Sequence, residues 1–285
     1  MSLVELAERA AAVDGVAPFN EATLFALRDR LRARVLVHQS DGDGRVIAAA
    51  YAAGDAPVEV VVDPARRREG IGRRILDELL ADGEHGYWAH GDLPAAQALA
   101  ASAGLVAGRT LLALRLTFDG PPATERVPEG VTLRTFAPDD VDQVVAVNAR
   151  AFAHHPEQGA MDRADMERRM ASDWFDAGGF FVAERDGRVI GFHWTKVEAQ
   201  PGDEPSGEVY VVGIDPDAQG GGLGTALTAR GLRHLFERGL PAVDLYVEGD
   251  NAPALTVYRK LGFVDRARDT LYVRPPNADE RHTHP

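Results

Sequence analysis

The sequence predicts an α/β fold of the α+β sandwich type, arranged as two tandem domains. Three observations support this prediction: a length of 285 residues, an internal repeat, and strands and helices in mixed order within each half. A chain of this length suffices for about two domains of typical size. The mixed order favours a sheet flanked by helices over a barrel of regular βα units.

The internal repeat consists of three blocks that occur in the same order in both halves. The first half reads RVIAAAYAAG, VVVDPARRREGIGRRILDELL and WAHGDLPAAQALAASAGLVA, and the second reads RVIGFHWTKV, VVGIDPDAQGGGLGTALTARGL and LYVEGDNAPALTVYRKLGFV. When the two Asp-Pro pairs are aligned, Gly70 and Gly72 match Gly222 and Gly224. Three matched blocks indicate a duplication.

The two domains are expected to join within DGPPATERVPEG, residues 119–130, because Pro and Gly are frequent there and hydrophobic periodicity lapses. The N-terminal domain is therefore predicted at residues 1–120 and the C-terminal domain at 130–285. Runs rich in Val, Phe and Tyr between turn residues predict the strands, and amphipathic runs predict the helices. In the second half the predicted strands are 132–136, 179–185, 188–197, 208–214, 242–247 and 263–273, and the predicted helices are 222–238 and 252–261.

Composition excludes several classes of function. The chain has no cysteine, so disulfides, thiolate metal sites and an acyl-cysteine intermediate are excluded. A formal net charge of -13 argues against nucleic acid as the main partner. The N-terminal segment is an acid-containing amphipathic helix pattern rather than a signal peptide, and no apolar run is long enough to span a bilayer. We therefore expect a cytoplasmic monomer with no membrane partner and no bound metal.

The strongest local pattern is a strand followed by Asp-Pro and then by QGGGLGTAL, residues 219–227, which opens a long helix. Glycines allow backbone N–H groups to converge, and a helix N-terminus offers unpaired donors and a positive dipole end. Such a turn binds a phosphate or diphosphate. The P-loop lysine is missing, and Leu227 stands where a dinucleotide fingerprint requires glycine, so a different phosphate ligand is indicated.

This pattern resembles the GNAT superfamily of N-acetyltransferases, whose acyl-CoA loop reads Gln or Arg, two residues, Gly, one residue, Gly or Ala. The second half has Gln219, Gly222 and Gly224 at these positions, and the first half has Arg67, Gly70 and Gly72. The superfamily's later motif also has counterparts in Asn251, Ala254, Tyr258, Gly262 and Phe263. The resemblance implies that each domain is a mixed, mostly antiparallel sheet flanked by helices, and that acetyl-CoA is the co-substrate.

The resemblance also implies which residues bind acetyl-CoA. In the second half the strand end would pair with the pantetheine arm, the turn would bind the diphosphate, and the later helix would contact the other side of the arm. These residues are Val212, Gly213, Ile214, Gln219, Gly220, Gly221, Gly222, Leu223, Gly224, Thr225, Asn251, Ala252, Pro253, Ala254, Leu255 and Thr256. The corresponding residues of the first half are Val60, Val61, Val62, Arg68, Glu69, Gly70, Ile71, Gly72 and Arg73. One departure is that glycine fills loop positions where a basic residue is common, which would weaken phosphate binding slightly.

Only the second half is expected to be catalytic. The first half has Ala100 in the position of Tyr258, so it lacks a phenol that could protonate the departing CoA thiolate. Side chains alternate along a strand, so Glu208 is expected to share a face with Tyr210 and Val212, where it could serve as the base for the amine. Glu208 could instead be a solvated carboxylate, and Tyr258 a core aromatic.

A second phenol, Tyr272, lies on the last predicted strand and could replace Tyr258 as the acid. The acyl acceptor must be a neutral amine when it attacks, so the site needs a group that takes its proton. The sequence does not choose between the two phenols.

Further blocks resemble the mycothiol synthase family, whose members are tandem GNAT proteins that acetylate the cysteinyl amine of a cysteine, glucosamine and inositol conjugate. The blocks are AVDGVAPFNE, WAHGDL, AFAHHPEQG, GFHWTKV, EVYVVGIDPDAQGGGLG and LYVEGDNAPA, and they span both halves. The resemblance implies contacts with this acceptor at Glu21, Glu157, Lys196, Glu208 and Tyr246. Carboxylates suit an ammonium and a polyhydroxylated sugar, and a lysine can donate to hydroxyls.

Two alternatives remain open from the sequence. The chain could be a tandem GNAT enzyme for another small amine, such as an aminoglycoside or a polyamine. It could also be a non-catalytic acyl-CoA sensor, although the presence of Asn251 and Tyr258 in one half argues against that.

Overall fold

The computed structural model describes residues 3–20, 23–24, 27, 34–52, 56–83, 85–154, 158–197 and 205–275. The chain forms two compact units. Unit 1 comprises residues 1–112 together with 267–285, and unit 2 comprises residues 113–266. The units therefore differ from the expected domain ranges at the C-terminal end, because the last part of the chain groups with the first half.

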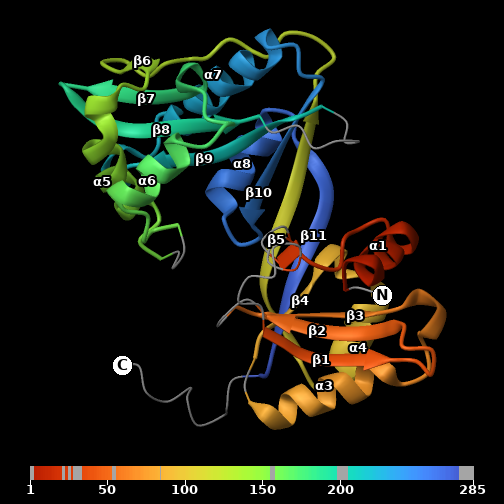
Figure 1. Ribbon diagram of the computed structural model, residues 1–285. Helices are drawn as coiled ribbons and strands as arrows, with labels where there is room; N and C mark the ends of the chain where they lie inside the picture. The colour runs from red at the N-terminus through yellow and green to blue at the C-terminus, as the bar shows by residue number, and fades with distance from the viewer. Residues whose placement is uncertain are drawn as a thin grey trace. The chain divides into compact units, whose positions relative to one another are not determined.

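Unit 1 has a sheet with the strand order β1-β2-β3-β4-β11 (Figure 1). Its elements are α1 (Leu3–Asp14), β1 (Arg34–Ser40), β2 (Val46–Ala52), β3 (Val58–Val62), α3 (Ile71–Asp82), β4 (Tyr87–Ala89), α4 (Pro94–Ser102) and the first part of β5 (Val106–Thr117). The last strand of the chain, β11 (Val264–Val273), enters this unit by pairing antiparallel with β4, Leu271 opposite Trp88. β11 thus adds a strand from the end of the second half to the sheet of the first half.

Unit 2 has the strand order β5-β10-β9-β8-β7-β6. Its elements are β6 (Thr132–Thr135), α5 (Val141–Ala151), α6 (Arg163–Met170), β7 (Phe180–Arg185), β8 (Arg188–Lys196), β9 (Gly207–Ile214), α7 (Leu223–Glu237), β10 (Ala242–Glu248) and α8 (Ala252–Lys260). Pairing is antiparallel from β6 to β9 and parallel between β9 and β10. Every predicted strand and helix of the second half is present within two residues of its expected bounds.

The prediction for the second half omitted two helices, α5 and α6. Val141, Val144 and Val147 recur at helical spacing and are buried on one side of the sheet with Met166 of α6. That spacing, typical of an amphipathic helix, was the available signal.

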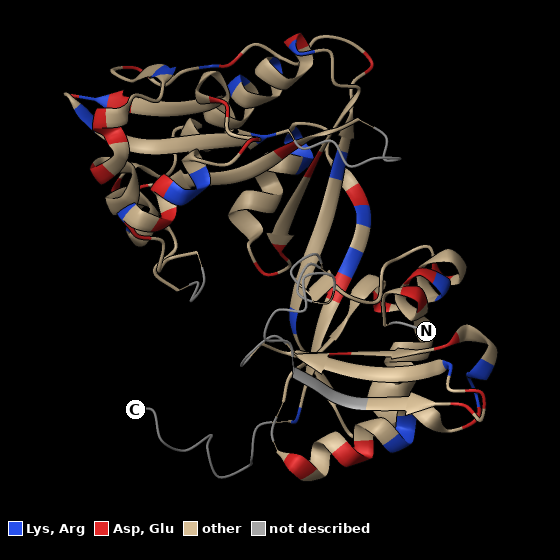
Figure 2. Cartoon of the chain, in the orientation of Figure 1, with Lys and Arg blue, Asp and Glu red and all other residues tan. Residues whose placement is uncertain are grey.

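Each sheet carries helices on both faces. In unit 1, α1 packs with Phe19 and Tyr51 on one face, and α3 packs with Ile47 on the other. In unit 2, α5 and α6 cover the face that includes Phe180, while Leu223 and Leu227 of α7 cover the opposite face. Many charged residues lie on the helices and turns, and β2 is uncharged, whereas β11 carries both acidic and basic residues (Figure 2). The predicted fold class is confirmed.

A buried histidine fixes α7 against the sheet of unit 2. His193 of β8 is fully buried, and its Nδ1 lies 2.8 Å from the carbonyl oxygen of Leu227. A Cβ added at Gly231 would come within 2.1 Å of the imidazole, so glycine there allows the helix to approach the ring. Burial lowers the pKa of His193 to about 4, so the ring is neutral.

The segment expected to join the domains is held on α7. Glu125, within residues 119–130, accepts hydrogen bonds from Arg230 Nη1 at 3.0 Å and from Arg233 Nε at 3.1 Å. Burial acts to raise the pKa of Glu125, but a backbone hydrogen bond and the two guanidinium groups outweigh it, so the pKa is lowered. The carboxylate therefore stays ionised and fixes this part of the chain to unit 2.

Candidate functional site

The Gly-rich turn of unit 2 leads from β9 into α7. Asp215 caps the short 3₁₀ helix η5 (Pro216–Ala218), because its side chain accepts a hydrogen bond from the Asp217 N–H at 2.9 Å. Gly220, Gly221 and Gly222 follow with φ values of 86°, 58° and 86°. This left-handed backbone strongly favours glycine. A Cβ added at any of the three would meet no protein atom within 4 Å, so the turn borders open space.

The start of α7 leaves backbone donors unused. The first helical bond runs from the Ala226 N–H to the Gly222 carbonyl at 2.9 Å, so the N–H groups of Gly224 and Thr225 have no acceptor within the helix. Gly222 contributes no capping side chain. Open space, converging donors and the positive end of a 15-residue helix together suit a diphosphate.

The two strands beside this turn diverge. In the described chain, β9 pairs with β10 only through Gly207↔Val243 and Glu208↔Asp244. Beyond Glu208 the edge of β9 that faces β10 therefore has unpaired backbone groups along residues 209–214. An extended ligand that pairs through its amides could add to such an edge.

A β-bulge interrupts β9 at Tyr210. Trp194 lies opposite Val211, but Thr195 lies opposite Val209, so Tyr210 is the extra residue. Tyr210 and Val211 both pack with the α5 and α6 side of the sheet, and Ile214 packs with α7. Val212 lies two residues before Ile214 and so shares the face that packs with α7. The expectation that Glu208, Tyr210 and Val212 share a face is therefore wrong for Val212, because the bulge at Tyr210 shifts the alternation by one residue.

The bulge places Glu208 on the same face as Lys196. The two residues are direct partners across β8 and β9, and both are half-buried. Tyr246, on β10, is 60% exposed. Of the five predicted acceptor contacts, these three lie in unit 2, and Glu21 and Glu157 lie outside the described residues.

The two candidate phenols lie in different units. Tyr258 of α8 is buried in unit 2 against Phe263, with ring centroids 5.7 Å apart, and burial raises its pKa to about 12. Tyr272 of β11 belongs to unit 1, where its hydroxyl donates to Asp92 Oδ1 at 2.8 Å. Burial and the Asp92 carboxylate raise the pKa of Tyr272 to about 12. The structure groups Tyr258, and not Tyr272, with the turn of unit 2.

Asn251 has a clear local role. Its side-chain oxygen accepts a hydrogen bond from the Ala254 N–H at 3.1 Å and so caps α8, whose first residues are Ala252 and Pro253. The corresponding residue in unit 1, Leu93, makes no side-chain cap for α4. Asn251 thereby fixes the start of the helix that carries Tyr258.

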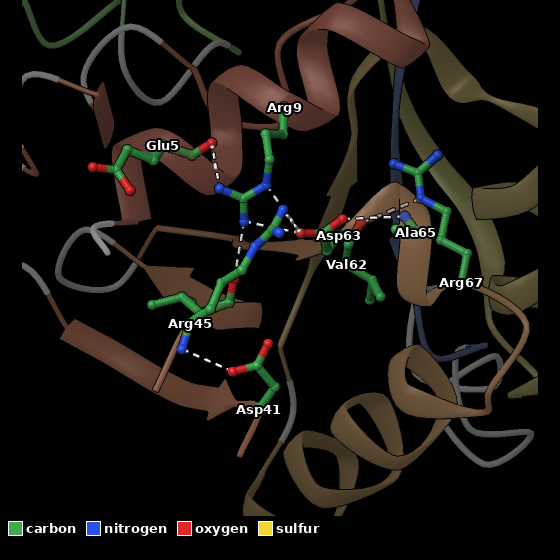
Figure 3. A network of polar contacts seen from close by, with 9 residues as sticks. Glu5, Arg9, Asp41, Arg45, Val62, Asp63, Ala65 and Arg67 are labelled. Atoms are coloured by element: carbon green, nitrogen blue, oxygen red, sulfur yellow. Dashed lines mark hydrogen bonds and ion pairs between the residues drawn. The ribbon is translucent and has the colours of Figure 1, made fainter. Parts of the chain in front are cut away.

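The corresponding turn of unit 1 is built around a buried aspartate, Asp63 (Figure 3). Its carboxylate accepts hydrogen bonds from Arg9 Nε at 3.0 Å, from Arg45 Nη2 at 3.1 Å and from the Ala65 N–H at 3.1 Å. Burial acts to raise the pKa of Asp63, but these hydrogen bonds and charges outweigh it and lower the pKa. Arg67 Nε donates to the Val62 carbonyl at 3.2 Å. The two Nη atoms of Arg67 also donate to the Asp14 carboxylate, each at 2.7 Å.

Unit 1 contains a cavity of about 530 Å³ beside this turn. β3 and β4 diverge after Val58↔Tyr87 and Glu59↔Trp88, as β9 and β10 do in unit 2. The buried hydroxyl of Tyr87 has no hydrogen-bond partner among the described residues. The predicted residues that line the cavity are Val60, Val61, Val62, Arg68, Gly70, Ile71, Gly72 and Arg73, and Tyr272 also lines it. Glu69 is not among the lining residues and pairs with Arg66 at 2.8 Å.

A charged histidine lies at the edge of this cavity. His90 Nε2 lies 2.6 Å from Glu59 Oε1, and His90 Nδ1 lies 2.9 Å from Asp269 Oδ2. Burial acts to lower the pKa of His90, but the two carboxylates outweigh it and raise the pKa to about 9. The ring therefore ties β11 to β3 as an imidazolium.

Neither metal ligation nor membrane insertion has a counterpart in the described structure. Among the described residues, no group of three or more His, Asp or Glu side chains is arranged to hold a metal ion. No described helix is both long enough and apolar enough to cross a membrane.

Comparisons with known proteins agree with this geometry. Residues 148–263 match the model of the acetyltransferase (GNAT) family. The chain is 50% identical to the mycothiol acetyltransferase of Thermomonospora curvata, covering 96% of this chain and 93% of that protein. It is 46% identical to the mycothiol acetyltransferase of Thermobifida fusca, with coverages of 96% and 94%.

Two solved structures are similar in fold. A GCN5-related N-acetyltransferase from Sphaerobacter thermophilus has a TM-score of 0.71 at 23% identity, covering 94% of this chain and 90% of that chain. A tandem GNAT protein from the clavulanic acid biosynthesis pathway has a TM-score of 0.62 at 22% identity, with coverages of 96% and 94%. At these identities the likeness concerns the tandem fold alone.

Proposed function

The chain belongs to the mycothiol acetyltransferase family of GNAT enzymes, and on that premise we propose its reaction. It transfers the acetyl group of acetyl-CoA to the cysteinyl amine of 1D-myo-inositol 2-(L-cysteinylamino)-2-deoxy-α-D-glucopyranoside, the last step of mycothiol biosynthesis. The observation that carries the proposal is identity of about half the residues over nearly the whole chain, both halves included. We propose direct transfer, and the absence of cysteine excludes an acyl-cysteine intermediate.

The residues of unit 2 fit acetyl-CoA. The backbone of Gln219, the three glycines and the first turn of α7, Leu223 to Thr225, takes the diphosphate, where the absence of Cβ atoms leaves room. The unpaired edge of β9 from Val209 to Ile214 takes the pantetheine arm, and α8 from Asn251 through Leu255 and Thr256 borders it. When bound, acetyl-CoA supplies an activated acetyl group.

The bulge supports a polarising contact with the thioester. An extra residue in a strand leaves its backbone group outside the ladder, so an N–H near Tyr210 and Val211 can turn toward a ligand. A fixed N–H donor aimed at a carbonyl oxygen stabilises the negative charge that develops there. We assign the oxyanion role to this bulge.

Two side chains are assigned to the reacting groups, one to the ammonium of the acceptor and one to the departing sulfur. Glu208 accepts the proton of the acceptor ammonium, directly or through water, at the point where β9 leaves β10. Tyr258 holds its proton across the neutral range, since its pKa is about 12. A phenol is then a weaker acid than a thiol of pKa about 8.5, so Tyr258 stabilises the departing sulfur mainly as a hydrogen-bond donor.

The acceptor is a small molecule bearing an amine and many hydroxyls. The matching positions of the family's blocks imply which residues contact the acceptor: Glu21, Glu157, Lys196, Glu208 and Tyr246. Lys196 and Glu208 support this assignment because they face each other across β8 and β9. Lys196 supplies donors for the hydroxyl groups of the acceptor, and Glu208 supplies a carboxylate for its ammonium.

The cavity of unit 1 binds acyl-CoA without turning it over. It has the same diverging strands and the same turn as unit 2, with Arg68 and Arg73 on its wall. It has no counterpart of the bulge, because β2 and β3 pair without interruption from Ala48↔Val62 to Tyr51↔Glu59. Ala100 stands in the position of Tyr258, so the phenol of that position is missing as well, although Tyr87 and Tyr272 line the cavity elsewhere.

The decisive experiment measures CoA release by the purified protein with a panel of amines. We expect turnover with the cysteinyl-glucosaminyl-inositol conjugate, and none comparable with aminoglycosides or polyamines. Glu208→Gln should lose most of this activity, about 10²-fold or more, since it removes the proton acceptor. Arg68→Ala, in unit 1, is the matched control and should lose little. Absence of CoA release with every amine of the panel would support the non-catalytic acyl-CoA sensor instead.

A further inference from the structure

Unit 2 contains an aromatic cluster whose outer member, Trp174, has no part in the function assigned so far. Trp174 lies between α6 and β7 and is half-buried. Its ring packs against Trp194 and Tyr210, with centroids 5.6 and 5.1 Å away. Trp194 is itself 1% exposed and stacks on Phe180 at 4.7 Å. Trp174 therefore rests on the fixed core of the unit.

The Lys196 ammonium lies over this cluster. Its Nζ is 5.2 Å from the centroid of the Trp174 ring and 5.9 Å from that of Tyr210. Both distances are within the roughly 6 Å at which a cation is attracted to an aromatic face. A lysine on a flexible four-carbon stem loses considerable rotamer entropy when it is held in one place. Two rings that contact the ammonium can supply that restraint.

The position of this contact relates it to the proposed acceptor. Lys196 is the direct partner of Glu208 across β8 and β9. Tyr210 is the extra residue of the bulge, so its ring has no cross-strand partner of its own and turns to the face that Lys196 shares. An aromatic face attracts the charge of an ammonium without engaging its N–H donors as a carboxylate would.

We propose that Trp174 is a positioning residue for the acceptor, acting through Lys196. Its ring, together with that of Tyr210, fixes the ammonium beside Glu208 so that Lys196 can donate to the acceptor's hydroxyl groups. This inference rests on the proposed function, because it takes Lys196 as an acceptor contact. It assigns to Trp174 an effect on the KM for the acceptor and none on the binding of acetyl-CoA.

The test is a double-mutant cycle on steady-state kinetics of the full chain. Trp174→Leu should raise the KM for the acceptor by about fivefold to thirtyfold, as expected for a partly desolvated cation–π contact. The kcat and the KM for acetyl-CoA should change less than about twofold. Trp174→Phe, which retains an aromatic face, should recover most of the loss. In a Lys196→Met background, Trp174→Leu should raise the acceptor KM less than about twofold further.

Phe175→Leu is the matched control. Phe175 neighbours Trp174 in the chain and packs on the same Trp194 ring, at 5.7 Å. The Lys196 ammonium lies over the rings of Trp174 and Tyr210 instead. Phe175→Leu should lower the melting temperature while leaving the acceptor KM unchanged. If Phe175→Leu raised the acceptor KM as much as Trp174→Leu, or if Trp174→Leu acted equally with and without Lys196, the role would be packing and the inference would be overturned.

Failure of the proposed function would look different. If the wild type released no CoA with the conjugate, the proposed reaction itself would be refuted. If the wild type turned over normally and Lys196→Met left the acceptor KM unchanged, the reaction would stand. In that case the assignment of Lys196 and the positioning role of Trp174 would both fail.

Discussion

The two Gly-rich turns have a similar backbone at both ends, but they differ in their side chains and at the middle position, where Gly221 has a φ of 58° and Glu69 has no positive φ. Arg67 and Gln219 have φ and ψ of -71° and 158° in unit 1, and of -67° and 159° in unit 2. Gly70 and Gly222 open the next helices at φ values of 77° and 86°. Between them, unit 1 has Arg68 in a left-handed conformation, φ 69°, where unit 2 has Gly220. Duplication thus preserved the backbone at both ends of the turn, and divergence changed its middle position and the charge around it.

The units differ more in the adjoining strand than in the turn. β9 contains the bulge at Tyr210, whereas β3 pairs with β2 in regular register. Similar turns indicate that both units can bind the same kind of ligand. The bulge beside the turn and Tyr258 occur in unit 2 and have no counterpart in unit 1, which is the ground for proposing turnover in unit 2.

The largest effect should come from making the same change in both turns. Gly222→Val places a β-branched side chain at a φ of 86° and into the open space of the turn. Strain and lost N–H convergence should together reduce kcat/KM for acetyl-CoA by about 10³-fold, or about 4 kcal/mol. Gly70→Val has equivalent strain in unit 1 and should reduce turnover less than about threefold. A larger loss from Gly70→Val than from Gly222→Val would reverse the assignment of the units.

The buried histidines of the two units should respond to pH in opposite directions. His90 has its pKa raised to about 9 by Asp269 and Glu59, which outweigh burial, so its stabilisation is complete below pH 6.5 and is lost as pH rises through 9. His193 has its pKa lowered to about 4 by burial, so its contribution is complete above pH 6.5 and is lost as pH falls through 4. Each contribution can reach about 3 kcal/mol, at 1.36 kcal/mol per pKa unit.

Amide hydrogen exchange resolved by residue measures these contributions separately. Protection of β2 and β3 should fall between pH 6.5 and 9.5, and protection of β8 should fall between pH 6.5 and 4. His90→Gln should flatten the alkaline pH dependence of exchange protection in unit 1. The pH dependence of protection in unit 2 should stay unchanged. A common pH dependence for both units, unaffected by His90→Gln, would contradict the two opposite shifts.

The two phenols provide a further comparison between the units. Tyr258→Phe should lower kcat by about 10²-fold, because it removes the donor to the departing sulfur. Tyr272→Phe removes a hydrogen bond to Asp92 in unit 1 and should change kcat less than about twofold. Single-turnover measurement of CoA release distinguishes a slower chemical step from slower product release. Equal losses for the two variants would show that the separation of roles is wrong.

The smallest effect should come from exchanging the charge of the turns. Gly220→Arg reproduces in unit 2 the left-handed arginine of unit 1, at a strain of about 1 kcal/mol. The added guanidinium should tighten binding of CoA to unit 2 by about fivefold at low salt, and high salt should remove the gain. Calorimetric titration measures this, with Arg68→Gly expected to weaken the site in unit 1. A Gly220→Arg variant whose affinity is salt-independent would exclude a direct phosphate contact.

The sequence was sufficient for the repeat, the turn and every element of the second half that was predicted, because each depends on local residue types, although α5 and α6 were omitted. Asp-Pro followed by glycines indicated the turn, and runs rich in Val, Phe and Tyr between turn residues indicated the strands. The bulge at Tyr210 was not predictable, because a register shift depends on which residue of β8 faces which residue of β9. For the same reason the residues sharing a face with Glu208 were only partly foreseen.

Long-range partners were also beyond the sequence. Nothing near Tyr272 indicates that β11 pairs with β4, about 180 residues earlier in the chain. The contact between Trp174 and Lys196 likewise joins separate segments. The domain that contains Tyr272 could therefore be assigned only once strand pairing was known.

The pairing of β11 with β4 has a consequence for synthesis on the ribosome. Unit 2 is continuous in the chain, whereas unit 1 includes residues from 267 onward. As the polypeptide emerges, unit 2 can therefore complete its fold while the earlier-made half still lacks a strand. The first half must remain partly open, with the edge of β4 exposed, until β11 has been synthesised.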